Sequence, residues 1–215
     1  MKKLIIPFVL LAAVLMFYPY LDDSDTHAPL TGLPWQIELL PDGATRVFGL
    51  TLSRSSLANA LAVLGQDMEL ALVAAADEVG NLEMYYGNYR AGLLSGKLVL
   101  QTSSSEDNLR RWRDNAVRFE HMASGQAKKY LLAEDDLPQV LQEVITGITF
   151  IPAVNLNDEI IVARFGEPVE RVQIDSAIHY LYPAKGIDIA VFDEAKEVIQ
   201  YVAPSEFKFI KIGSK

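Results

Sequence analysis

The chain has 215 residues, a net charge of −9, no cysteine and a hydrophobic fraction of 50%. This length allows one or two domains, and the hydrophobic content is sufficient for a buried core. The lack of cysteine excludes a disulfide scaffold, thiolate metal sites and a cysteine nucleophile. The acidic balance argues against nucleic acid as a partner and against broad contact with an anionic membrane surface.

The N-terminus has the pattern of a membrane anchor. Two lysines precede an uncharged apolar run from Leu4 to Leu21. The run is as long as the shortest membrane-spanning helices and longer than the apolar part of a signal peptide. The best cleavage site ends at Ala28, where Pro29 would block cleavage. We therefore predict a single-pass helix over residues 1–21 in a bacterial inner membrane, with the C-terminal part in the periplasm. A cleaved signal peptide is the alternative.

Residues 22–34 have the composition of a linker, since they are rich in aspartate and turn-forming residues. After the linker, apolar periodicity predicts short helices among strands. Helices are expected over 55–64, about 105–121, about 136–146 and about 157–165. Strands are expected over 36–40, 46–50, 69–75, 82–86, 97–102, 128–133, 148–151, 170–174, 177–182, 187–192 and 198–202. Short turns join the last four strands, and such turns permit only antiparallel pairing.

Two stretches of the chain look alike. Each has a capped short helix that ends at a glycine, Gly65 or Gly166, and each continues into strands with a tyrosine-rich segment. Glycine at this place supplies the backbone conformation that ends a helix and returns the chain to a sheet. We therefore predict an α+β fold of two related helix-plus-antiparallel-sheet halves behind the N-terminal transmembrane helix, with the helices on one sheet face. The modules are expected over 35–133 and 134–215.

The second stretch resembles a known family. It reads Phe165-Gly166-Glu167-Pro168, then Tyr180-Leu181-Tyr182-Pro183, then two further strands. This pattern is similar to the small outer-membrane-assembly lipoproteins (SmpA/OmlA, BamE) and to each half of the tandem β-lactamase inhibitor protein. The first stretch, Leu64-Gly65-Gln66-Asp67, matches less well because it lacks the proline. Members of these groups mostly bind proteins, so the resemblance implies a binding module.

Short catalytic and metal-binding motifs are absent from the sequence. The three histidines, His27, His121 and His179, are not at metal-ligand spacing. Ser95 precedes Gly96-Lys97, but the upstream glycine of a phosphate-binding loop is missing. Adjacent acid pairs at 77–78, 135–136 and 158–159 fit turns or first helical turns, where the helix dipole favours acids. We predict no catalytic residue, no metal and no cofactor.

The tyrosines carry the strongest remaining signal. Tyrosine is enriched in interfaces because it offers a large contact area and a hydrogen bond. Tyr180 and Tyr182 are expected on one face of their strand, with His179 and Leu181 on the other. Ordinary packing in the core is the alternative for all of these tyrosines. The predicted partner-binding residues, on an exposed sheet face, are Tyr85, Tyr89, Tyr180 and Tyr182.

Together these features predict a membrane-tethered periplasmic adaptor without catalytic activity, whose partner is another envelope protein. It would contact the membrane through its N-terminal helix and would not bind nucleic acid. Two alternatives stay open. One is a periplasmic hydrolase with an unrecognised carboxylate or histidine site, which a convergent cleft of perturbed acids would indicate. The other is a released inhibitor or ligand-binding protein.

Overall fold

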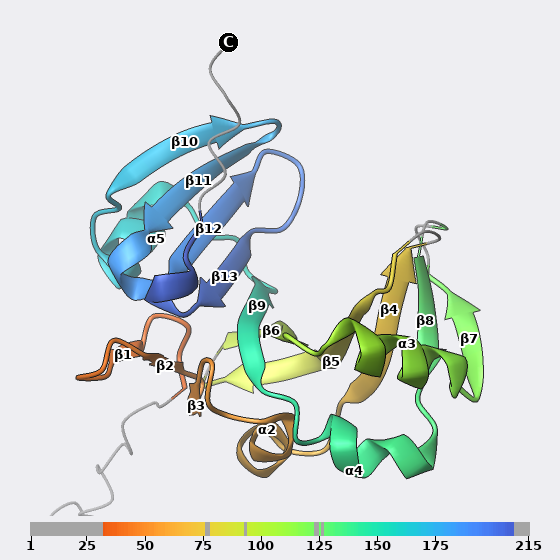
Figure 1. The fold of residues 1–215 in the computed structure, drawn as a ribbon. Coiled ribbons are helices and arrows are strands. Elements are labelled where there is room, and N and C mark those ends of the chain that lie inside the picture. Colours follow the sequence, from red (N-terminus) through yellow and green to blue (C-terminus); the bar gives the residue numbers. More distant parts are fainter. Residues whose placement is uncertain (1–31, 76–77, 93, 123–124, 126, 209–215) are drawn as a thin grey trace, which may run out of the picture. The chain divides into compact units, whose positions relative to one another are not determined.

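The structure is a computed structural model that describes residues 32–75, 78–92, 94–122, 125 and 127–208 (Figure 1). These residues all belong to one compact unit. The membrane helix predicted over 1–21 lies outside them. Within the described ranges, no helix is long and apolar enough to cross a membrane. The predicted single-pass inner-membrane location is therefore not supported, and we withdraw it.

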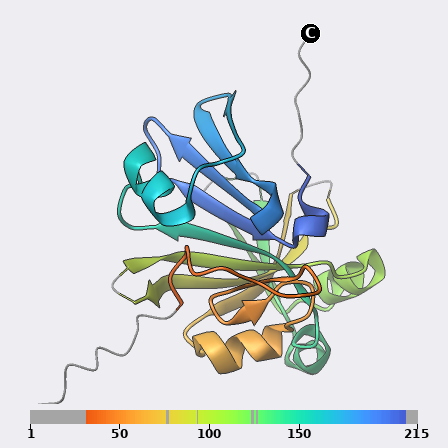
Figure 2. The same cartoon turned by 90° about the vertical axis from the view of Figure 1, so that its left-hand side faces the viewer.

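A ten-stranded antiparallel sheet dominates the fold, in the order β10-β11-β12-β13-β9-β6-β5-β4-β8-β7. Its strands are β4 (Glu69–Ala75), β5 (Asn81–Ala91), β6 (Leu94–Thr102), β7 (Arg118–His121), β8 (Ala127–Leu131), β9 (Ile145–Pro152), β10 (Glu170–Ile174), β11 (Ala177–Tyr182), β12 (Ile187–Phe192) and β13 (Val198–Val202). A small sheet of β1 (Glu38–Leu39), β2 (Thr45–Val47) and β3 (Leu50–Thr51) precedes it. In two views this small sheet lies between α5 and α2 (Figure 1, Figure 2).

The helices in the described residues are short. They are α2 (Leu57–Leu64), α3 (Glu106–Asp114), α4 (Leu137–Val140) and α5 (Asp158–Phe165), with 3-10 turns η1 (Glu134–Asp136), η2 (Pro183–Lys185) and η3 (Pro204–Glu206). The side chains of Ser56, Ser105 and Asn157 cap α2, α3 and α5, respectively, by accepting hydrogen bonds from the first helical turn.

The predicted fold class is wrong. Instead of two helix-plus-sheet halves, one continuous sheet crosses the expected module boundary at 133–134, because β9 pairs with β6 on one side and with β13 on the other. Strand dominates, and the four helices of the described residues have only four to nine residues each. The transmembrane helix expected over 1–21 lies outside the described residues, and none of the helices described is long and apolar enough to cross a membrane.

Two predicted helices are shorter than expected for the same reason. The helix expected up to residue 121 ends at Asp114, and the chain then forms β7, which pairs with β8. The helix expected up to about residue 146 ends at Val140, and β9 begins at Ile145. Strand pairing overrides the local helical pattern in both places, with the next strand in the case of β7 and with the distant strands β6 and β13 in the case of β9.

The two similar stretches nevertheless share local geometry. Gly65 and Gly166 follow α2 and α5 with φ of 94° and 87°, a region that favours glycine. The Tyr86 hydroxyl donates a hydrogen bond to the Gly65 carbonyl at 3.0 Å, and the Tyr182 hydroxyl donates to the Gly166 carbonyl at 2.9 Å. Each tyrosine therefore ties a helix end to the second strand after it.

The core lies on one face of the large sheet. Alternate residues of each central strand point into it, as Met84, Leu98 and Phe150 do. All four α-helices of the described residues contribute to the same buried cluster, through Leu57 of α2, Leu109 and Trp112 of α3, Val140 of α4, and Ile161 and Phe165 of α5. The helices thus pack on this face, and no described helix contributes to the opposite face of the sheet.

Candidate functional site

The sheet face opposite the core is the candidate site, and we call it the polar face. Cross-strand pairing places Tyr85, Val99, Thr149, Gln200 and Asp188 in one row, on β5, β6, β9, β13 and β12. Each of these side chains is partly or fully exposed. Since the helices use the core face, this row is open to a partner over five neighbouring strands.

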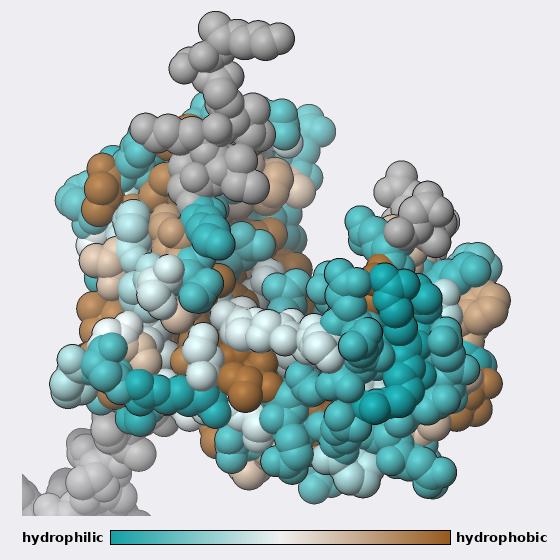
Figure 3. Space-filling view, viewed as in Figure 1, coloured by the Kyte–Doolittle hydropathy of each residue, from teal (hydrophilic) through white to brown (hydrophobic). Residues whose placement is uncertain are grey.

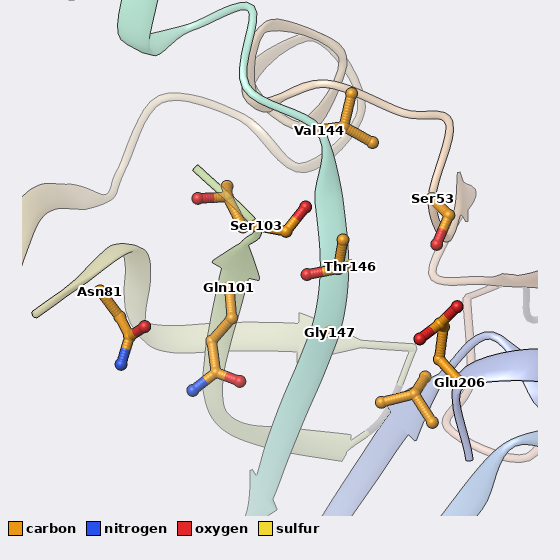
Figure 4. Close-up of a pocket in the computed structure, with 10 residues that line it drawn as sticks. Ser53, Asn81, Gln101, Ser103, Val144, Thr146, Gly147 and Glu206 are labelled. Atoms are coloured by element: carbon orange, nitrogen blue, oxygen red, sulfur yellow. The ribbon is translucent and has the colours of Figure 1, made fainter. Parts of the chain in front are cut away.

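A groove of about 740 Å³ opens beside this row. In the space-filling view the surface is hollowed between β11–β13 and β4–β8 (Figure 3). The groove is made where the ends of β6 and β13 meet the start of β9. Its lining residues are Ser53, Asn81, Gln101, Thr102, Ser103, Val144, Thr146, Gly147, Val202 and Glu206. Asn81, Gln101 and Ser103 lie on one side of β9, and Ser53 and Glu206 lie on the other (Figure 4).

A β-bulge shapes the floor of the groove. Gln101 pairs with Gly147, and Thr102 pairs with Ile145, so β9 has one extra residue, Thr146, between these pairs. The bulge keeps Ile145 fully buried while Thr146 and Gly147 both line the groove. A Cβ on Gly147 would lie 3.3 Å from Oε1 of Gln101, so the absent side chain makes room for that amide.

Ser53 forms part of the groove wall in a strained backbone conformation. Its φ is 61°, which few residues other than glycine, asparagine and aspartate adopt. The backbone N–H of Ser53 donates to the carbonyl oxygen of Ile145 at 2.7 Å, and this bond ties the wall to the start of β9. Strained non-glycine residues concentrate at functional sites. The strained backbone and this hydrogen bond together set the position of Ser53 in the groove wall.

The groove is polar but carries little charge. Among its described lining residues, Glu206 is the one ionisable group, and none is lysine or arginine. A second acid, Glu83, adjoins the groove because it is the cross-strand neighbour of the lining residue Gln101. Burial raises the pKa of Glu83 above its usual value, although a hydrogen bond with Gln101 acts in the opposite direction. The site thus presents amide and hydroxyl groups, which both donate and accept hydrogen bonds.

A histidine–aspartate pair lies farther along the polar face. Nδ1 of His179 on β11 is 2.9 Å from both carboxylate oxygens of Asp188 on β12. Burial raises the pKa of the Asp188 carboxyl, while the hydrogen bond with His179 and its charge lower it. The hollow that Asp188 lines has a volume of only about 120 Å³. The carboxylate of Asp188 fixes the orientation of the His179 ring, but little room adjoins Asp188 for a substrate.

The structure separates the four tyrosines predicted to bind a partner. Tyr180 and Tyr182 are buried, with exposed fractions of 5% and 4%, so their expected position on an exposed sheet face is wrong. Helix α5 covers them, since Phe165 packs on Tyr182 with ring centroids 6.2 Å apart. Tyr89 is half-buried on the core side, 5.6 Å from the ring of Phe48.

Tyr85 is the member of this group that lies on the polar face, and its side chain is half-buried. It follows Asn81 and Glu83 along the same face of β5, so the phenol extends the line that starts in the groove. Gly87, two residues farther, leaves space beside the Tyr85 ring, because a Cβ there would lie 3.4 Å from it. Sequence alternation alone could not distinguish Tyr85 from the buried tyrosines.

The adjacent acid pairs noted in the sequence form no metal site among the described residues. Asp158 and Glu159 lie in the first turn of α5, and Asp158 accepts a hydrogen bond from Arg171 at 3.1 Å. Asp77 lies outside the described residues. No group of three or more acidic or histidine side chains suited to a metal ion occurs in the described part of the chain. The groove residues carried no sequence motif, and only their places at strand ends could have drawn attention to them.

Comparisons with protein-family models, with curated proteins and with solved structures found no match to this chain. The geometry of the polar face therefore carries the functional assignment.

Proposed function

We propose that the protein is a binding module that holds a segment of another protein on its polar face, with the groove as the specificity-determining part. The observation that carries this proposal is the open face itself. It has five neighbouring strands without helical cover among the described residues and a groove of about 740 Å³. The resemblance of the sequence to protein-binding families points to the same class of function.

The lining chemistry favours a polypeptide over an anionic ligand. Asn81, Gln101 and Thr146 can each donate and accept hydrogen bonds, as the backbone of a peptide requires. Nucleic acid and phosphate ligands depend on lysine and arginine, and neither occurs among the lining residues described. A loop or extended segment of a partner protein would satisfy these groups.

Tyr85 is the expected anchor of the contact. Tyrosine is frequent among residues that dominate binding energy because it combines a large apolar area with a polar tip. Tyr85 lies on β5 two residues beyond Glu83, whose cross-strand partner Gln101 lines the groove, and its side chain is only half-buried. Binding at the groove would bury the rest of the ring, whereas Tyr180 and Tyr182 have no surface left to bury.

Hydrolysis is a second candidate because His179 and Asp188 form the hydrogen-bonded pair that orients a general base in many hydrolases. The adjoining hollow, about 120 Å³, is smaller than the 300–1,000 Å³ typical of ligand pockets. Binding on the larger groove is thus the better-supported function. A His179→Ala variant that loses activity toward a peptide or ester substrate would favour the hydrolase instead.

Site-specific crosslinking tests the proposal. A photoreactive phenylalanine analogue replaces Gln101 in the full chain, and illumination in an extract of the source cells should give a discrete adduct with one protein. The matched control places the same analogue at Val63, which is 52% exposed on α2 and lies away from the polar face. Adducts of equal size and yield from both positions, or from Val63 alone, would contradict the proposal.

A further inference from the structure

Strand β7 is an edge of the large sheet, with no second neighbouring strand among the described residues. It lies at one end of the strand order, next to β8, and all four of its residues are exposed. Phe119 on this strand is 50% exposed, and the residues that flank the strand, Val117 and Met122, are 73% and 41% exposed. Exposed sheet edges invite pairing with another strand, and proteins usually protect them. This edge combines exposed apolar side chains with two charged ones, Arg118 and Glu120.

The backbone of β7 is prepared for a further strand. In an antiparallel ladder, alternate residues direct both N–H and C=O toward the neighbouring strand. The N–H of Met122 donates to the carbonyl oxygen of Ala127 on the β8 side at 2.9 Å. Arg118 and Glu120 lie four and two residues before Met122, so their backbone N–H and C=O groups also point toward β8. The backbone N–H and C=O groups of Phe119 and His121 therefore point away from β8, outward from the sheet edge.

The side chains of β7 are self-complementary. Arg118 and Glu120 point to one sheet face, and Phe119 and His121 point to the other, where their rings are 5.7 Å apart. If a second β7 runs antiparallel with Phe119 opposite the partner subunit's Phe119, then Arg118 stands opposite the partner subunit's Glu120. The same register places Glu120 opposite the partner subunit's Arg118. One face of the seam is then aromatic, and the other holds two pairs of opposite charges.

We propose that β7 is a self-association edge at which a second copy of this chain adds, antiparallel, across a two-fold axis at Phe119. Each Phe119 would exchange two backbone hydrogen bonds with the partner subunit's Phe119. Opposite charges directly across strands stabilise the pairing, and like charges destabilise it. The proposal concerns an edge distant in strand order from the groove and does not depend on the proposed binding function.

The other sheet edge, β10, lacks this symmetry. A two-fold axis at its central residue, Val172, would place Arg171 opposite the partner subunit's Gln173 rather than opposite an acid. Arg171 is also engaged within its own chain, 3.1 Å from Asp158 and 3.5 Å from Glu167. In β7, Arg118 contacts Glu120 of the same strand at 3.2 Å, and Glu120 also contacts Lys129 at 3.4 Å. The difference between the two edges is therefore the charge pattern, because only β7 places an acid opposite its arginine across the two-fold axis.

Charge-swap variants of the full chain test the register. Arg118→Glu and Glu120→Arg each place two like-charge pairs in the seam, so each variant alone should raise the dimer dissociation constant by about tenfold or more in sedimentation equilibrium. An equimolar mixture of the two variants restores opposite charges at both positions. The mixture and the Arg118→Glu/Glu120→Arg double variant should therefore recover dimerisation to near the wild-type level.

Three results would overturn the proposed association through β7. Wild-type protein that stays monomeric over the whole concentration series would overturn the proposal. So would single variants that associate like wild type, since association would then use another surface, or a mixture that fails to recover. Unchanged thermal unfolding of each single variant confirms that its fold is intact. A Phe119→Cys variant gives an independent measurement, because the chain has no other cysteine and an oxidised dimer should form faster than with Val63→Cys.

Discussion

Removing one hydroxyl from Tyr182 tests how the helix ends are held. The hydroxyl donates to the carbonyl oxygen of Gly166 at 2.9 Å, and the side chain is 4% exposed. Tyr182→Phe keeps the ring and leaves this carbonyl without its partner. A buried hydrogen bond of this kind contributes about 1 kcal/mol, and the unpaired carbonyl adds to the loss. We expect the free energy of unfolding to fall by about 1–2 kcal/mol and Tm to fall by roughly 2–8 °C.

Urea unfolding followed by circular dichroism measures this effect. Tyr86→Phe should cost a similar amount, because its hydroxyl donates to the Gly65 carbonyl at 3.0 Å at the end of α2. Tyr85→Phe is the matched control, since the described residues hold no hydrogen bond of its hydroxyl, and it should change stability by less than about 0.5 kcal/mol. If Tyr182→Phe were as stable as the Tyr85→Phe control, the reasoning on the helix ends would be refuted.

Two further predictions concern the core and high pH. Gly96→Ala should lower the free energy of unfolding by about 1–3 kcal/mol, because the new Cβ would lie 2.5 Å from the Ile151 carbonyl oxygen and 2.6 Å from the Phe150 ring; unchanged urea unfolding would contradict this. Burial raises the pKa of Tyr86 and of Tyr182 to about 12, so the neutral phenols stabilise the fold fully below pH 10, and this contribution is lost as the pH rises from 10 to 12. The Tyr86→Phe/Tyr182→Phe double variant should show a shallower fall of the urea midpoint over that range, and an equally steep fall would refute the assignment.

Local sequence patterns located much of the fold. The predicted strands 69–75, 170–174, 177–182, 187–192 and 198–202 are confirmed as β4 and β10–β13. Short turns and alternating side chains fix such strands locally. The end of α2 before Gly65 and the end of α5 before Gly166 follow from the same kind of local signal, a helix that stops at glycine.

The arrangement of the strands in one sheet depends on pairing between distant segments, which the local sequence pattern does not indicate. Strand β9 joins β6 to β13 and makes one sheet, although its residues lie far from both in the chain. Strand β11 also shows why the prediction of an exposed face at Tyr180 and Tyr182 was wrong. Leu181 and Tyr182 point to opposite faces, yet they are 2% and 4% exposed, so alternation could not indicate which face was open.

The groove depends on tertiary structure even more strongly. Its bulge at Thr146, its wall at Ser53 and its rim at Glu206 come from three distant parts of the chain. No spacing within the sequence connects these residues. Only Tyr85 links the sequence-based binding hypothesis to the site that the structure presents.

The affinity of the crosslinked partner, once purified, tests the central claim most directly. Titration against the full chain should show that Tyr85→Ala weakens binding by about thirtyfold, as expected for an interface anchor worth about 2 kcal/mol. Val63→Ala, exposed on α2, should bind like wild type. A Tyr85→Ala variant that melts like wild type and binds the partner with unchanged affinity would contradict the assignment of the polar face as the binding surface.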